Sequence, residues 1–278
     1  MKILFCNKYN FPFSGTEVYL FELMELLQSH GHKVALFSVA NAHGAHSQFE
    51  EHLVPHIDFK TARGFRQRTK LAAHAIYSHQ AREELSKVLA AFRPDVAHVR
   101  NIYHHLSPSI LWELRSQSVP VLYHLNDFKI ICPSYNLVAH GRHCDRCRGG
   151  HFWHVMTSGC YDGGRGSSAV LAAEAYLHKL LGTYAKCVDR FLAPSHFVRN
   201  KLIKNGFEGG KIDVLYHFQR LPEQAPPRRQ RRRAHPIFRA ALTGKRSDRS
   251  ALCDADTAPS AVTDCGRRST TNRIRADC

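Results

Sequence analysis

Long apolar runs are missing from this 278-residue sequence. No stretch approaches the roughly 18 apolar residues that a membrane-spanning helix needs. The apolar start is interrupted at Asn7 and Lys8, too early for the core of a signal peptide. We therefore expect no transmembrane segment and a cytoplasmic location. Because thiols stay reduced there, the nine cysteines indicate free thiols or metal ligands rather than a disulfide framework.

Acidic side chains are also scarce, with 23 Asp and Glu against 39 Lys and Arg, a formal net charge of +16. Half of this excess lies in residues 225–278, which hold 13 Lys and Arg and 5 Asp and Glu. This tail shows no aliphatic periodicity, and we expect it to be disordered. Its few aromatic side chains offer little base stacking, so nucleic acid is not a favoured partner.

Residues 1–222 alternate short apolar runs with amphipathic stretches, the pattern of an α/β domain. We therefore predict a single Rossmann-like parallel sheet with flanking helices over 1–222, interrupted by a loop at 126–166 and followed by a tail at 223–278. The predicted strands are 3–6, 33–39, 53–57, 96–100, 119–125, 189–194 and 213–218, and the predicted helices include 14–31, 67–92, 108–118 and 195–205.

The first strand-to-helix turn carries a candidate ligand site. Ser14 and Glu17 have the spacing of a capping box, and Gly15 lies between them. A helix start presents backbone N–H groups that favour an anionic or hydroxyl-rich ligand. An ordinary strand-helix-strand unit without a ligand is an equal alternative on this segment alone.

The loop at 126–166 is rich in Cys, His, Gly and Arg. Its cysteines can supply four thiolates to a tetrahedral Zn²⁺, and a long polar loop benefits from such a crosslink. Reduced thiols without a metal are an alternative of similar weight. The candidate metal ligands are Cys132, Cys144, Cys147 and Cys160, with His143, His151 or His154 able to replace one of them.

Several segments together resemble the N-terminal domain of family 4 glycosyltransferases, retaining enzymes of GT-B type that transfer a sugar from a nucleotide donor. Each segment alone is a weak signal, and their order and spacing make the resemblance specific over residues 1–222. It implies the N-terminal half of a GT-B fold. The segments are 2–9, 12–17, 31–34, 93–98, 126–133 and 191–198.

The resemblance implies a substrate-binding role for the first turn, which lies in the cleft that faces the donor diphosphate and the acceptor in such enzymes. Where the family usually has two adjacent glycines, this chain has Ser14 and Gly15. A small residue still permits close approach of the backbone. The substrate-binding candidates are Ser14, Gly15, Thr16 and, in a later turn, Ser195.

The family also has a His-Asp pair after the fifth strand, with its histidine near the transferred sugar. The aligned pair here is Asn126-Asp127, and His124 lies two positions earlier on the same face of the strand. The resemblance makes these three residues the catalytic candidates, although an Asn side chain cannot exchange a proton as histidine does. His124 as a satisfied strand histidine and Asp127 as a turn residue remain open alternatives.

The resemblance implies a glycosyltransferase domain that uses a nucleotide-sugar donor, a lipid-linked or polysaccharide acceptor and no metal for transfer. The family's second, donor-binding domain has no counterpart after Phe218, so we expect the chain to be inactive alone. From Pro227 onward the sequence resembles a GC-rich coding region read out of frame, and we hypothesise a frameshift or truncation near 225–233.

The location of such an enzyme is expected to be cytoplasmic, peripheral at the inner membrane face. Four cations, Arg63, Arg66, Arg68 and Lys70, can dock an anionic membrane surface, although such residues more often only aid solubility. The alternative function is a nonenzymatic Rossmann-like binding or regulatory module, with a zinc loop and a basic tail that binds nucleic acid or lipid.

Overall fold

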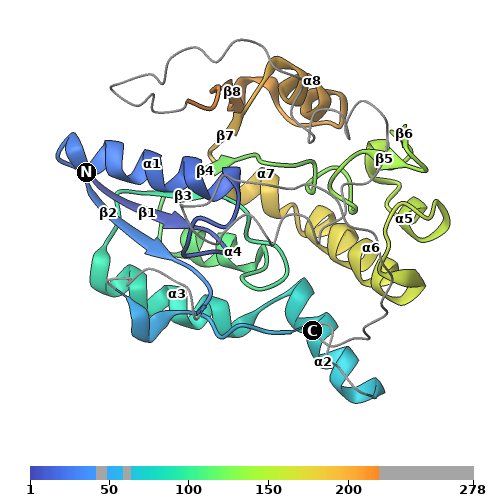
Figure 1. Ribbon diagram of the computed structural model, residues 1–278, viewed down its shortest axis with the longest axis horizontal. Coiled ribbons are helices and arrows are strands. Elements are labelled where there is room, and N and C mark those ends of the chain that lie inside the picture. Colours follow the sequence, from blue (N-terminus) through green and yellow to red (C-terminus); the bar gives the residue numbers. More distant parts are fainter. Residues whose placement is uncertain (42–48, 59–63, 219–278) are drawn as a thin grey trace, which may run out of the picture. The chain divides into compact units, whose positions relative to one another are not determined.

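The domain is built on a six-stranded parallel sheet (Figure 1). The structure is a computed structural model that describes residues 1–41, 49–58 and 64–218. The strand order is β2-β1-β3-β4-β7-β8, and every neighbouring pair is parallel. The carboxyl ends of the strands therefore meet along one edge. The strands are β1 (Lys2–Cys6), β2 (Lys33–Phe37), β3 (Val96–Val99), β4 (Val121–His124), β7 (Arg190–Ala193) and β8 (Ile212–Val214).

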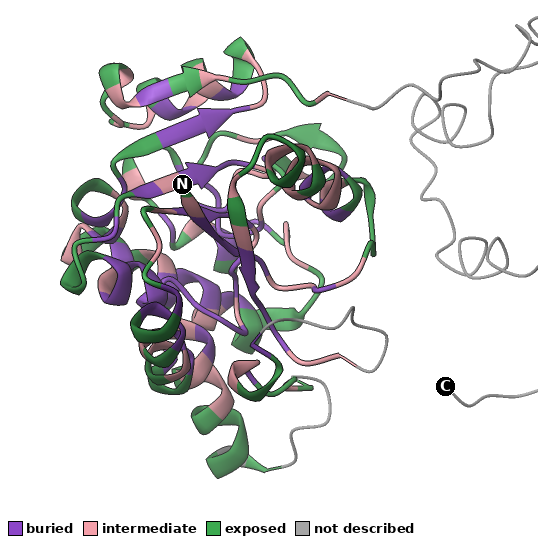
Figure 2. Cartoon of the chain, turned by 90° about the vertical axis from the view of Figure 1, so that its left-hand side faces the viewer, coloured by how far each residue is buried: buried purple, intermediate pink, exposed green. Residues whose placement is uncertain are grey.

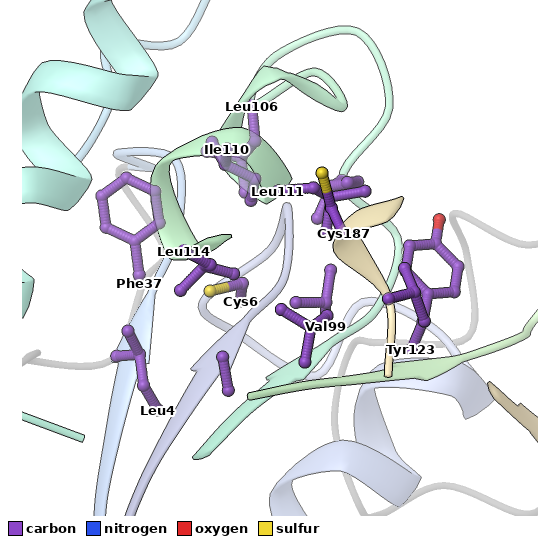
Figure 3. Packing of buried hydrophobic residues seen from close by; sticks show 14 of the residues in the cluster. Leu4, Cys6, Phe37, Val99, Leu106, Ile110, Leu111, Leu114, Tyr123 and Cys187 are labelled. Atoms are coloured by element: carbon purple, nitrogen blue, oxygen red, sulfur yellow. The ribbon is translucent and has the colours of Figure 1, made fainter. Parts of the chain in front are cut away.

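Helices cover both faces of this sheet, which confirms the predicted α/β fold. Leu4 and Cys6 of β1 point to a face packed by α3 (His79–Phe92) and α4 (Ser109–Ser116), as Figure 3 shows for α4. The alternate residues Ile3 and Phe5 pack on the opposite side, against α1 (Gly15–Ser29). Burial on both faces explains why these strands are short continuous apolar runs (Figure 2).

The remaining elements lie in the connections between the strands of the sheet, most of them between β4 and β7. A small antiparallel hairpin lies within the predicted Cys-rich loop. These elements are η1 (Glu50–His52), α2 (Phe65–Ile76), β5 (Val138–Ala139), β6 (Arg142–His143), η2 (Arg148–Gly150), α5 (His154–Thr157), α6 (Gly164–Leu181), α7 (Thr183–Cys187), α8 (His196–Lys204) and η3 (Gly209–Lys211).

Two predicted elements differ from the observed ones. The single helix predicted over 67–92 is wrong, because the chain is extended at Tyr77 and a new helix begins after Ser78. The Ser78 hydroxyl accepts a hydrogen bond from the Ala81 backbone N–H at 3.1 Å and caps α3. The strand predicted at 53–57 is reduced to one parallel bridge between Val39 and Val54.

Among the helices of residues 1–41, 49–58 and 64–218, none is both long enough and apolar enough to cross a bilayer. The predicted tail at 223–278 and the frameshift proposed near 225–233 lie outside the described residues.

Candidate functional site

A group of buried polar side chains lies where β1 to β4 end. Asn7 follows β1, Ser38 follows β2 and Arg100 follows β3. Ligands of open parallel sheets bind outside this carboxyl edge. We call the group the strand-edge cluster, and its members are Asn7, Asn10, Tyr19, Ser38, Arg100, His124 and Asn126.

Arg100 is the central member of the cluster and is completely buried. Its Nη2 donates a hydrogen bond to Oδ1 of Asn126, and its guanidinium carbon lies 4.7 Å from the centre of the Tyr19 ring. Burial lowers the pKa of Arg100 to about 10, against the opposing influence of Tyr19 and Glu17. The guanidinium therefore keeps its positive charge at neutral pH.

Several polar atoms of the cluster are buried without a hydrogen-bond partner among the described residues. They include both Nε and Nη1 of Arg100, the Tyr19 hydroxyl and Nε2 of His124. A buried polar atom without a partner costs free energy of about 1–3 kcal/mol, and more where the group is charged. The two Arg100 nitrogens can only donate, so an anion would satisfy the part of the cluster at the guanidinium. The other unpaired cluster atoms are Oδ1 of Asn7, Oδ1 of Asn10, Oγ of Ser38 and Nδ2 of Asn126.

A histidine pair lies beside Arg100. Nε2 of His98 on β3 is 3.1 Å from Nδ1 of His124 on β4, and the His98 ring stacks on Phe5 with centroids 4.8 Å apart. Burial first, and then the nearby Arg100 charge, lower the pKa of His98 to about 3 and that of His124 to about 2. Both rings are therefore neutral at neutral pH, and the neutral His124 ring can form a hydrogen bond with a ligand through Nε2.

The segment after β8 covers part of the cluster. The His217 ring centroid lies 4.5 Å from that of Tyr19 and 5.3 Å from that of His124, and the Phe218 ring is 5.0 Å from Tyr19. His217 itself is exposed. The His217 and Phe218 rings therefore cover part of Tyr19, and His217 also covers part of His124.

The first turn lies beside the cluster, but its cap differs from the prediction. The Ser14 hydroxyl donates to the Glu17 carboxylate at 2.5 Å instead of bonding a backbone N–H, so the predicted capping box does not form. At Gly15 a Cβ atom would meet nothing within 4 Å, which leaves open space above the start of α1. Thr16 follows Gly15 in the first turn of the helix and is half-buried.

Two other candidates have structural partners. The Asp127 carboxylate accepts a hydrogen bond from the Lys129 backbone N–H at 2.9 Å, the turn geometry that the sequence left open. Burial raises the pKa of Asp127, and the Lys129 backbone N–H and charge oppose the rise. The Ser195 hydroxyl accepts from the Val198 N–H at 3.3 Å, which confirms the predicted cap of α8.

The four cysteines predicted as zinc ligands line one small cavity of about 10 Å³. Over residues 1–41, 49–58 and 64–218, however, no set of three or more His, Cys, Asp or Glu side chains is arranged to hold a metal ion. Burial, followed by the proximity of the other three cysteines, raises the pKa of the Cys147 thiol to about 12. The structure therefore does not support the zinc expectation for Cys132, Cys144, Cys147 and Cys160.

Sequence reasoning missed Arg100 and Tyr19. A signal for Arg100 was present, because His98 and Arg100 repeat the two-residue spacing of His124 and Asn126 on the adjacent strand. Residues two apart share a face, so both pairs reach the same edge. Tyr19 gave no such signal, because an aromatic residue on an amphipathic helix usually belongs to the core.

Comparison with known proteins identifies the family. The model of Glycosyltransferase Family 4 matches residues 13–218, and no match emerges among curated proteins. Similar solved structures include the UDP-GlcNAc 2-epimerase of Methanocaldococcus jannaschii, with 13% identity, a TM-score of 0.39 and coverage of 77% of this chain and 45% of that one. The UDP-GlcNAc 2-epimerase of Neisseria meningitidis bound to UDP-GlcNAc has 13% identity, a TM-score of 0.38 and coverage of 77% and 45%.

A lipopolysaccharide outer core galactosyltransferase, WaaB, has 13% identity, a TM-score of 0.42 and coverage of 83% of this chain and 50% of that one. The chain thus spans about half the length of these structures. The family model covers most of the described residues, including all of the strand-edge cluster except Asn7 and Asn10. The chain belongs to Glycosyltransferase Family 4.

Proposed function

We propose that this domain forms one wall of a glycosyl-transfer site and that its strand-edge cluster binds the diphosphate of a nucleotide-sugar donor. The observation that carries the proposal is the buried, charged Arg100 with two unpaired guanidinium nitrogens. Buried guanidinium nitrogens without hydrogen-bond acceptors are costly, and two separate phosphate oxygens of a diphosphate could each accept a hydrogen bond from one of them.

Neutral neighbours complete the proposed binding site. The Tyr19 hydroxyl, Nε2 of His124 and Nδ2 of Asn126 are within the same buried cluster and are unpaired among the described residues. They suit the hydroxyl groups of a sugar and the remaining phosphate oxygens, since each can donate a hydrogen bond without adding charge. The open space above Gly15 would admit the part of the donor or acceptor nearest α1.

Catalytic roles follow from the same placement. His124 would contact the transferred sugar through Nε2, because its Nδ1 is engaged with His98. Asp127 would position the turn after β4 through its hydrogen bond to Lys129, and Ser14, Thr16 and Ser195 would contribute to substrate binding at two helix starts. Stabilising the departing diphosphate is the main task of such a site. We propose that transfer requires a donor-binding domain opposite this wall.

The acceptor and the location complete the proposal. We propose a lipid-linked or polysaccharide acceptor and a peripheral position on the cytoplasmic face of a membrane. Arg66, Arg68 and Lys70 of α2 are all exposed and would meet an anionic lipid surface, while Arg63 lies outside the described residues. The alternative function, a regulatory module with a basic tail, depends on residues that are likewise outside the described part.

The test is calorimetric titration of the purified chain with UDP, inorganic pyrophosphate and uridine, using wild type and Arg100→Gln. Charged hydrogen bonds contribute about 1.5–3 kcal/mol each, so losing one predicts roughly 10- to 150-fold weaker binding of UDP and pyrophosphate. Arg190→Gln is the matched control, because Arg190 begins β7 at the opposite edge of the sheet. It should leave both affinities unchanged.

Folding stability separates a binding role from a structural one. If Arg100 exists for binding, the Arg100→Gln protein should stay folded and lose no more stability to urea than the loss of its contacts with Asn126, Tyr19 and Glu17 explains. Equal binding of pyrophosphate by wild type and Arg100→Gln would refute the proposal. So would a variant that loses stability and anion binding together while uridine still binds.

A further inference from the structure

A cavity lies outside the strand-edge cluster and shares none of its residues. It has a volume of about 310 Å³, at the lower end of the range for small-molecule sites. Its walls come from the turn after β4, the segment around η2, the helices α6 and α7, and the connection between α8 and β8. We call it the α6 cavity.

The walls of the α6 cavity are mainly apolar. Phe152, Tyr184, Phe191 and Phe207 contribute aromatic rings, and Ile130 and Ile131 contribute aliphatic side chains. The Phe191 and Phe207 rings meet edge to face with centroids 5.4 Å apart, so this wall is already packed without a ligand. A lining of this kind favours an apolar ligand by the area it removes from water.

The inner end of the cavity is polar but electrically balanced. The Lys129 ammonium donates to the Glu174 carboxylate at 2.7 Å, and both side chains are only 3% exposed. Lys129 also lies over the rings of Tyr103 and Tyr135, at 5.7 and 5.3 Å. His178 has partners at both ring nitrogens, the Thr183 hydroxyl and the Ile76 carbonyl. Because the charges of Lys129 and Glu174 balance each other, the inner end has no net charge that a charged ligand group would neutralise.

The outer end, by contrast, carries exposed cations. Lys179 is exposed and its ammonium lies 5.8 Å from the Phe152 ring, and Lys211 is 42% exposed. The Glu208 carboxylate is 3.9 Å from Lys211, and the Lys179 ammonium donates a hydrogen bond to the carbonyl oxygen of Gly149. An ammonium has three donors, so Lys179 can still bond a ligand oxygen, and no ion pair joins it to a carboxylate of the described lining residues.

We propose that the α6 cavity binds a single-chain amphiphile, with its aliphatic chain between the aromatic walls and an anionic phosphate head at Lys179 and Lys211. The small volume suits one chain rather than the two chains of a bilayer lipid. This site is separate from the donor site proposed above and does not depend on it.

The test is titration of the full chain with decyl phosphate below its micellar concentration, followed by tryptophan fluorescence and calorimetry. The chain has two tryptophans, and neither is itself a lining residue of the cavity. Trp153 follows Phe152, and Trp112 donates to the hydroxyl of Thr183, which lies between the lining residues Gly182 and Tyr184. We expect saturable 1:1 binding of decyl phosphate, at least 10-fold weaker binding of decanol, and no binding of inorganic phosphate.

Variants locate the site. Ala175→Leu fills the cavity from α6 and should weaken decyl phosphate binding at least 10-fold, whereas Ala173→Leu, on the exposed side of the same helix, should leave it unchanged. The surface variant Lys179→Gln with Lys211→Gln should reduce decyl phosphate to the affinity of decanol, and it keeps the test valid if Ala175→Leu fails to fold.

The proposal would be overturned by the absence of saturable decyl phosphate binding, by equal binding to the Ala175→Leu and Ala173→Leu proteins, or by decanol binding as tightly as decyl phosphate. Binding to phosphatidylglycerol vesicles without binding of monomeric decyl phosphate would also contradict it, because that result indicates docking on a lipid surface.

Discussion

Acidification should destabilise the fold through the buried pair of His98 and His124. Burial and the nearby Arg100 charge lower their pKa values to about 3 and about 2, from 6.5 for an ordinary histidine. The Phe5 ring and the edge of Tyr19 enclose the pair, and His217 covers His124. As the pH falls below 6.5, the two histidines therefore become protonated in the unfolded chain but stay neutral in the folded protein.

The sign and size follow from linkage between proton binding and folding. The contribution of each histidine to stability is complete above pH 6.5 and is lost as the pH falls toward the pKa of the folded state. Between pH 7.5 and pH 5 the loss is about 2 kcal/mol per histidine, or about 4 kcal/mol for the pair. Against a typical total stability of about 5–15 kcal/mol, this is a large fraction.

Urea unfolding at pH 7.5 and pH 5 measures the effect. His98→Asn removes one titrating ring, so its stability should fall about 2 kcal/mol less than that of wild type over this interval. His140→Asn changes an exposed loop residue with φ of 51°, a conformation that asparagine accepts, and should behave as wild type. If His98→Asn and wild type lose equal stability, the histidine pair does not carry the acid sensitivity.

Three further predictions concern stability and can be measured by urea unfolding at pH 7.5. Lys129→Met leaves the buried Glu174 carboxylate without its cation and should lower the free energy of unfolding by about 3–5 kcal/mol. Adding Glu174→Leu should restore much of that loss. A double variant as unstable as the single one would contradict this account of the pair. Ser195→Ala removes a hydroxyl that caps α8 and should lower the free energy of unfolding by about 1 kcal/mol. Ser14→Ala should cost less, because the Ser14 hydroxyl bonds no backbone N–H of α1. The reverse order would refute the assigned caps. Gly182→Ala should destabilise the protein by about 1 kcal/mol, because Gly182 ends α6 with a φ of 67°. Gly166→Ala lies inside the helix and faces open space, so it should stabilise the protein by up to about 1 kcal/mol. Equal effects of the two substitutions would contradict the assigned conformations.

Most strands of the sheet could be predicted because each is a short continuous apolar run. The predicted 96–100 and 119–125 contain β3 and β4, and 3–6 lies within β1, because burial on both faces keeps these runs mainly apolar. The break between α2 and α3 could not be predicted in the same way. It depends on the Ser78 hydroxyl, which caps α3, and serine also occurs within helices.

The candidate site was predictable in position but not in chemistry. The ends of β1 and β4 drew attention to Gly15 and Asn126, because parallel strands bring their carboxyl ends together. Pairing across strands supplied what the sequence could not: Arg100 bonds Asn126, and His98 bonds His124. Burial then determines the charges, since Arg100 stays protonated while both histidines stay neutral. No local pattern reports burial of this kind.

The central claim is that the unpaired nitrogens of Arg100 receive the anionic group of the ligand. Nuclear magnetic resonance of the arginine Nε–Hε group tests it directly, with the signal of Arg100 assigned by its loss in Arg100→Lys. On titration with UDP, the account predicts a saturable shift of this signal and slower exchange of its proton with water. The account is contradicted if UDP binds and backbone signals shift while the Arg100 Nε–Hε signal stays unchanged.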